Sequence, residues 1–119
     1  DEAALLSWLD SGGRVNATGR TGDANGITVL MYAAQQGHER VVELLLQRGA
    51  QVNMQNSHGI NSLMVAASSG HERVVELLLR RSAEINLQTS DGDTALMFAA
   101  GGGSEQVVEL LLRHGAEIN

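Results

Sequence analysis

One ten-residue pattern occurs three times along the chain, at a constant spacing of 33 residues. It reads Gly-His-Glu-Arg-Val-Val-Glu-Leu-Leu-Leu at residues 37–46 and 70–79, and Gly-Ser-Glu-Gln-Val-Val-Glu-Leu-Leu-Leu at residues 103–112. A period of this length is typical of solenoid proteins, whose units cannot bury their own apolar face and become stable by stacking on one another. The spacing therefore predicts an array of similar stacked units.

The similarity between the copies extends beyond this pattern. Each copy opens with a turn and an apolar stretch rich in alanine, at residues 26–34, 59–67 and 92–100. Each closes with a second turn, at residues 49–53, 82–86 and 115–119. In these features the sequence resembles the ankyrin repeat, a turn plus two helices with a 33-residue period. The resemblance covers nearly the whole chain.

The resemblance implies an all-α fold, an ankyrin-like helical solenoid of stacked helix-turn-helix repeats joined by β-hairpin-like fingers. We expect a single domain over residues 1–119. Its expected parts are a partial repeat (1–16), a repeat with a long first finger (17–53), and two further repeats (54–86 and 87–119). The first finger is four residues longer than the others, and either a binding insertion or a disordered loop would account for it.

Two sets of positions depart from the regular pattern. Met31, Met64 and Met97 stand where the family pattern has a hydrogen-bonding His. A thioether cannot replace that bond, so we expect a row of stacked Met side chains without the family's polar contacts between repeats; a metal-binding Met cluster is the alternative. Ser82 replaces the glycine of the other copies at a turn, and we expect a strained left-handed conformation there.

Composition excludes several classes of function. The net charge is −6, and the longest run of basic residues is Arg80-Arg81, so binding to nucleic acid is not expected. The chain has no cysteine, which fits a reducing compartment, and we predict a cytoplasmic or nuclear location. No signal peptide or membrane span is expected. Because the sequence starts at Asp1 without Met, we interpret it as a trimmed fragment.

The sequence predicts no enzyme, no cofactor and no metal site. His38 and His71 each precede a Glu, but the second His of a His-Glu-x-x-His zinc motif is absent, so we expect hydrogen bonding at the start of a helix instead. The run 101–104, Gly-Gly-Gly-Ser, lacks the Lys and spacing of a phosphate loop and is interpreted as a turn between helices. Asp91-Gly92-Asp93 lacks the further ligands of a calcium loop.

What is known of the family implies that the fingers and the first helix of each repeat line a concave surface that grips other proteins. By register, the finger positions of this surface are Arg20, Ala24, Asn25, Ile27, Ser57, His58, Ile60, Ser90, Asp91 and Asp93. The helix positions are Tyr32, Gln35, Gln36, Val65, Ser68, Ser69, Phe98, Gly101 and Gly102. These positions differ between the copies while the scaffold positions repeat, which indicates a surface free to specialise. For Tyr32 and Phe98, packing and partner contact remain alternatives.

We therefore predict a non-catalytic protein–protein interaction module that binds a partner protein or peptide through the concave face. Apolar Ile27, Tyr32 and Ile60 lie in the first two repeats and acidic Asp91 and Asp93 in the last finger, so a partner with an apolar anchor and a basic flank would fit. The alternative is a self-associating fragment, stacked end to end, or a spacer or regulatory domain of a larger protein. The resemblance also implies possible hydroxylation of three turn asparagines, Asn53, Asn86 and Asn119.

Overall fold

The structure is a computed structural model that describes residues 2–12, 14–16, 18–21 and 24–118. The described residues form the following elements in chain order: α1 (Glu2–Asp10), β1 (Thr18–Thr21), β2 (Ala24–Thr28), α2 (Val29–Gln36), α3 (Glu39–Gln47), α4 (Ser62–Ser68), α5 (Glu72–Arg80), α6 (Ala95–Gly101) and α7 (Glu105–Arg113). The predicted helical solenoid is confirmed.

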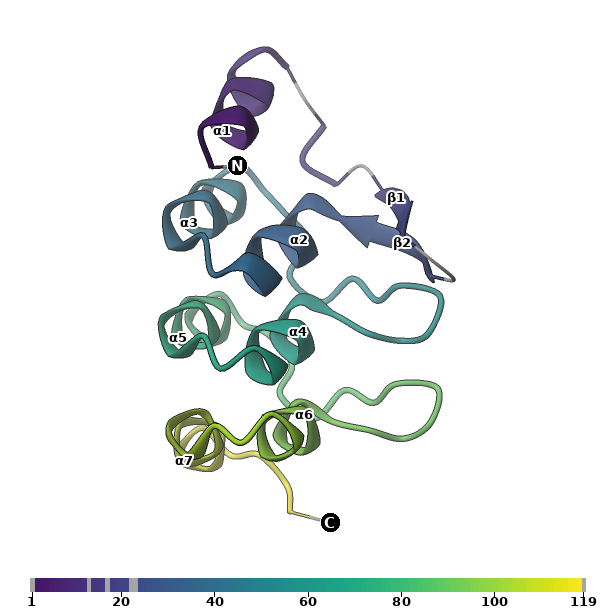
Figure 1. The fold of residues 1–119 in the computed structure, drawn as a ribbon, viewed down its shortest axis with the longest axis vertical. Helices are drawn as coiled ribbons and strands as arrows, with labels where there is room; N and C mark the ends of the chain where they lie inside the picture. The colour runs from purple at the N-terminus through teal and green to yellow at the C-terminus, as the bar shows by residue number, and fades with distance from the viewer. Residues whose placement is uncertain (1, 13, 17, 22–23, 119) are drawn as a thin grey trace.

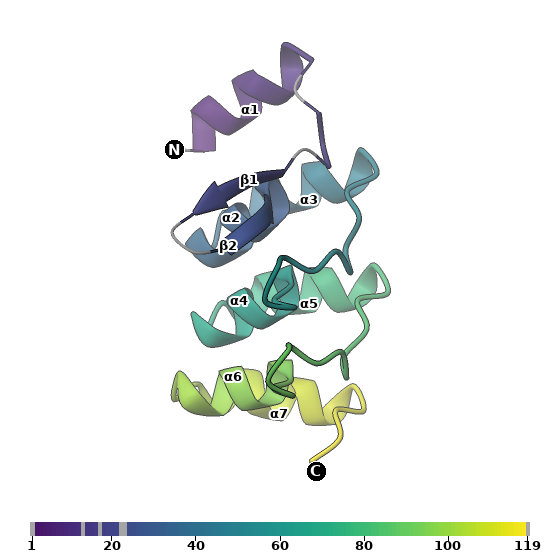
Figure 2. The same cartoon turned by 90° about the vertical axis from the view of Figure 1, so that its right-hand side faces the viewer.

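The helices form two columns along the long axis of an elongated molecule that measures 43 × 27 × 22 Å. The first column contains α2, α4 and α6, and the second column contains α1, α3, α5 and α7 (Figure 1). The loops that precede α2, α4 and α6 project as fingers from the side of the first column (Figures 1 and 2). None of the helices in the described part of the chain is both long enough and apolar enough to cross a membrane.

The α5 helix shows how the repeated pattern produces a second-column helix. Glu72 lies in the first turn, where the partial positive charge at the helix N-terminus stabilises a carboxylate. The apolar stripe of this helix is buried, with Val74 and Leu78 at 0% exposure. On the outer face, Glu76 accepts from Arg73 at 2.7 Å and lies 3.2 Å from the guanidinium of Arg80. The pattern therefore gives a helix with one buried face and one charged face.

The first-column helices are shorter, and small side chains allow them to pack closely. Ala33, Ala66 and Ala99 are each fully buried between neighbouring helices. An N-terminal side chain caps two of these helices: the Thr28 hydroxyl accepts from the backbone N–H of Met31, and the Asn61 amide oxygen accepts from that of Met64. Thr94 precedes the third helix at the same position and is buried, and its hydroxyl has no hydrogen-bond partner among the described residues.

The row of Met side chains is only partly as predicted. Met31 and Met64 are buried, with 3% and 1% of their surface exposed. Met97 is 42% exposed, because no further repeat covers the last first-column helix among the described residues. The prediction of a stacked row therefore holds for Met31 and Met64 and is wrong for Met97.

Polar side chains join neighbouring repeats at positions other than those that Met occupies. The Asn53 amide oxygen accepts from the backbone N–H of Glu84 at 2.7 Å, and the Asn86 amide oxygen accepts from that of Glu117 at 2.9 Å. Asn16 makes the corresponding bond to the backbone N–H of Gln51 at 2.8 Å. Each of these asparagines is the last residue of its repeat, and its side-chain amide binds the closing turn of the next repeat. The polar link between repeats therefore lies at a different position from the one that Met occupies.

The expected roles of the two histidines also need correction. His38 and His71 occupy the N-terminal cap positions of α3 and α5, but neither side chain bonds to its own helix start. Instead, the Nε2 atom of His71 lies 2.9 Å from the carbonyl oxygen of Gln35 in the preceding repeat. A carbonyl oxygen can only accept, so Nε2 carries the proton in this bond. At the same register, Ser104 caps its own helix by accepting from the N–H of Val107.

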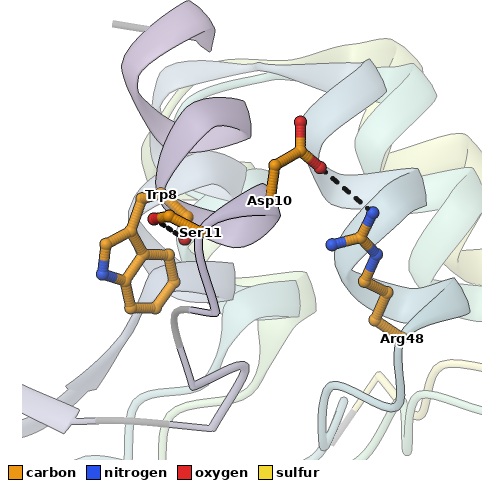
Figure 3. A network of polar contacts seen from close by, with 4 residues as sticks. All are labelled: Trp8, Asp10, Ser11 and Arg48. Carbon is orange, nitrogen blue, oxygen red and sulfur yellow. Dashed lines mark hydrogen bonds and ion pairs between the residues drawn. The ribbon is translucent and has the colours of Figure 1, made fainter.

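At the N-terminal end of the array, α1 packs beside α3, and the interpretation of residues 1–16 as a partial repeat stays a prediction. Leu9 is buried, and half-buried Trp8 packs against the same core. Figure 3 shows two polar contacts at this end: the Ser11 hydroxyl donates to the carbonyl oxygen of Trp8, and Asp10 lies 3.4 Å from Arg48 at the end of α3. Both charged side chains are exposed, so this ion pair contributes less than about 1 kcal/mol.

Ser82 adopts the left-handed conformation that the sequence predicts, with φ of 68°, and it is the one non-glycine residue with positive φ among the described residues. We expect Ser82→Gly to raise the free energy of unfolding by about 1 kcal/mol, since glycine removes the steric cost of this conformation. Urea unfolding measures the change. Ser69→Gly is the matched control, because Ser69 has φ of −85° and gains nothing from glycine. An equal or lower stability of Ser82→Gly than wild type would contradict the interpretation.

Gly37 and Gly103 occupy the same register, with φ of 74° and 75°, but they differ in which atoms of the neighbouring repeat lie close to them. A Cβ at Gly37 would lie 2.8 Å from the His71 ring, whereas a Cβ at Gly103 would meet nothing within 4 Å. We expect Gly103→Ala to lower the free energy of unfolding by about 1 kcal/mol and Gly37→Ala by about 2 kcal/mol, since the second also displaces the His71 hydrogen bond. Thermal or urea unfolding tests this order, and equal losses would contradict it.

Candidate functional site

The surface that the sequence singles out is formed by the three fingers and by α2, α4 and α6, and we call it the finger face. The first finger is a two-stranded antiparallel sheet of β1 and β2. Ile27 pairs with Gly19 and Asn25 with Arg20, so Gly26 is an extra residue that forms a bulge. The described residues of the long first finger are thus paired strands, and residues 22–23 lie outside the described part.

The second and third fingers are tight turns held by one polar side chain each. The Asn56 amide oxygen accepts from the backbone N–H groups of His58 and Ile60, both at 2.9 Å. At the same register in the next repeat, the Thr89 hydroxyl accepts from the N–H groups of Asp91 and Asp93. These bonds fix the backbone of each finger without using the side chains at its tip.

Neighbouring fingers are also joined to each other. The backbone N–H of Ser90 donates to the carbonyl oxygen of His58 at 3.0 Å. The Gln55 side-chain N–H donates to the carbonyl oxygens of Gly59 and Gln88, at 2.8 and 2.9 Å. The finger face is therefore held in place by bonds within and between repeats.

The structure places most of the predicted contact residues at the surface. The exposed ones are Tyr32, Gln35, Gln36, Ser57, His58, Ser68, Ser69, Ser90 and Asp91. The half-buried ones are Ile60, Val65, Asp93 and Phe98, and all of these except Asp93 pack against the core. Arg20, Ala24, Asn25 and Ile27 have their backbone in the strands of the first finger, and their side chains lie outside what the structure describes.

Five of the predicted residues come together at one point. The third finger meets α4 and α6 at a shallow hollow of about 250 Å³, which is lined by Ser68, Asp93, Phe98, Gly101 and Gly102. Met97 completes its lining. The sequence predicts Met97 in a buried row and not at this surface; its position in the last repeat was the signal that it could be exposed. The other predicted residues do not line this hollow.

Two further hollows lie between second-column helices, on surfaces that the sequence did not single out. The first, of about 330 Å³, lies between α3 and α5 and is lined by Glu43, Leu46, Gln47, Leu77, Arg80 and Arg81. The second, of about 340 Å³, lies between α5 and α7 and is lined by Glu72, Arg73, Glu76, Gln106, Glu109, Leu110 and Arg113. Both are lined by acidic and basic side chains together, which offers no single charge for a partner to match.

Among the described residues, no group of three or more His, Cys, Asp or Glu side chains lies close enough together to hold a metal ion. The glycine run near the end of α6 is the predicted turn between helices: α6 ends at Gly101, and Ser104 caps α7. That cap already occupies a backbone N–H that a phosphate would need.

Two of the asparagines named for hydroxylation hold the repeats together. Asn53 and Asn86 accept backbone N–H groups of the following repeat, as described above. Asn119 lies outside the described residues. Hydroxylation at these positions stays a prediction.

Comparison with known proteins defines the class. A family model described as "Ankyrin repeats (3 copies)" matches residues 3–89 and again residues 30–119. The two matches together span almost the whole chain, and the helix pairs and fingers are those that the family pattern implies. The chain belongs to the ankyrin-repeat family. A search of curated proteins found no match.

Membership of this family sets the general kind of function. Ankyrin repeats are in general protein–protein interaction modules, and the family is of a non-catalytic type. The repeats stack into an extended surface, and such surfaces are what solenoid proteins use for binding.

Proposed function

We propose that this chain is a non-catalytic interaction module that binds a partner protein or peptide through the finger face. The observation that carries the proposal is the contrast between two sets of positions. Buried positions such as Ala33, Ala66 and Ala99 are identical in the three repeats and fully buried. Finger-face positions at one register, such as Gln35, Ser68 and Gly101, differ in every repeat and are exposed.

The polar bonds that fix the fingers support the same proposal. The finger turns are held by Asn56 and Thr89 and tied to each other through His58 and Ser90. A surface that is already ordered binds without the entropy loss of ordering loops, which favours affinity. The partner that fits has an apolar anchor for the region of Tyr32, which is 44% exposed, and a basic flank for Asp91. The location we propose is cytoplasmic or nuclear.

We expect a variant changed on the finger face to lose its partner, and a variant changed on the second column of helices to keep it. The finger-face variant carries Gln36→Arg, His58→Arg and Asp91→Arg, all at exposed positions. The matched control carries Gln47→Arg, Gln106→Arg and Glu109→Arg, which are exposed on α3 and α7 and change the net charge equally. Wild type and both variants are immobilised, cytosolic extract is passed over them, and retained proteins are identified by mass spectrometry.

A protein retained by wild type and control but lost from the finger-face variant would support the proposal. Equal retention by all three chains would contradict it. Circular dichroism and thermal unfolding of each variant show that a loss does not arise from unfolding.

The alternative is self-association, and one observation favours it. Ala34 and Ala67 are fully buried by the following repeat, whereas the equivalent Ala100 is exposed. A hollow of about 440 Å³ lies at this end of the array and is lined by Ala100, Gly103, Ser104, Glu105, Val108 and Glu109. A further repeat from a second copy would cover this face. Recovery of the chain alone in the same experiment, with a sedimentation coefficient that falls on dilution, would favour this alternative.

A further inference from the structure

We propose that the hollow between the third finger, α4 and α6 binds one basic side chain, Arg or Lys, of a partner protein. This inference rests on the proposed function and names the chemistry of one contact. The hollow has a volume of about 250 Å³. Pockets for drug-sized ligands start at about 300 Å³, and one water takes about 30 Å³ of liquid volume, so the space suits a single long side chain.

The apolar part of the lining fits the stem of such a side chain. Met97 has 42% of its surface exposed and Phe98 is half-buried, packed against the core on its other side. Lys and Arg lay their methylene groups along apolar surface and keep the charged end in water. An aromatic ring also attracts a cation placed over its face, and Arg makes this contact most often.

The charge of the lining decides the sign of the ligand. Asp93 is the one charged residue among those that line the hollow. It makes none of the ion pairs found among the described residues, which are those of Asp10 with Arg48 and of Glu76 with Arg73 and Arg80. The chain carries a net charge of −6, which adds to the attraction for a cation.

The backbone of the finger positions Asp93 without using its carboxylate. The Asp93 N–H donates to the Thr89 hydroxyl at 3.1 Å, and its carbonyl oxygen accepts from the Thr89 N–H at 2.9 Å. Because both bonds are made by backbone atoms of Asp93, its carboxylate oxygens remain available for a ligand. Replacing the carboxylate by an amide would leave the finger turn intact.

The glycines open the hollow, and one of them cannot be replaced. A Cβ at Gly101 would meet nothing within 4 Å, while a Cβ at Gly102 would clash with the carbonyl oxygen of Ser68. At the register of Gly101 and Gly102 the other repeats carry exposed Gln or Ser side chains, and at the register of Asp93 they carry Ile. The combination of an acidic side chain with neighbouring glycines therefore occurs in this repeat and in neither of the other two.

An NMR titration tests the proposal directly. The purified chain is titrated with four N-acetyl amino acid amides, those of arginine, lysine, citrulline and norleucine. We expect the arginine and lysine amides to shift the backbone signals of Gly101 and Gly102 and the methyl signal of Met97 in a saturable way. Citrulline keeps the shape of arginine without its charge, and we expect it and norleucine to bind at least 5-fold more weakly.

Two variants with the same change in net charge separate the hollow from general attraction. Asp93→Asn should weaken arginine-amide binding at least 5-fold. Asp91→Asn lies in the same finger, is exposed and does not line the hollow, so it should change binding less than 2-fold. The backbone spectrum of each variant shows that the fold is retained.

Three results would overturn the inference: no saturable shift with the arginine or lysine amide, equally tight binding of norleucine or citrulline, or equal losses in the two variants. Its failure is distinct from failure of the proposed function. A partner that is captured through the finger face while no amide binds would leave the interaction module standing without this contact.

Discussion

Each repeat needs its neighbours to bury its apolar face, and the rest of the structure depends on this stacking. The middle repeat shows the effect, because α4 lies between α2 and α6 in the first column of helices (Figure 1). Met64 and Ala67 are there almost completely buried, whereas the equivalent Met97 and Ala100 of the last repeat are exposed. The same residues are therefore core or surface according to whether a neighbour covers them.

The polar contacts between repeats set the register of this stack and order the finger face. Asn53 and Asn86 tie the closing turn of one repeat to that of the next, while Gln55 joins adjacent fingers. Each bond contributes about 1 kcal/mol, less than the apolar contacts, but each needs a particular geometry. A stacked array with fixed fingers can therefore present differing side chains at equivalent positions without disturbing the shared scaffold.

The sequence predicts the scaffold well because the scaffold is what repeats. The spacing places each helix pair, and the glycine of the other copies predicts the left-handed conformation of Ser82. The contacts between repeats escaped prediction, since they depend on which atoms of neighbouring units come together. The bond from His71 to Gln35 is one example. The hollow at Asp93 is another, because register named five of its residues but not the exposure of Met97.

Stability in this array comes from contacts between neighbouring repeats. Amide hydrogen exchange, measured residue by residue under native conditions, tests this dependence. We expect the slowest exchange in α4 and α5, which have a repeat on both sides, and faster exchange in α1 and α7, which are covered on one side by the described residues. Exchange in α1 and α7 as slow as in α4 and α5 would show that the end helices do not depend on neighbouring repeats.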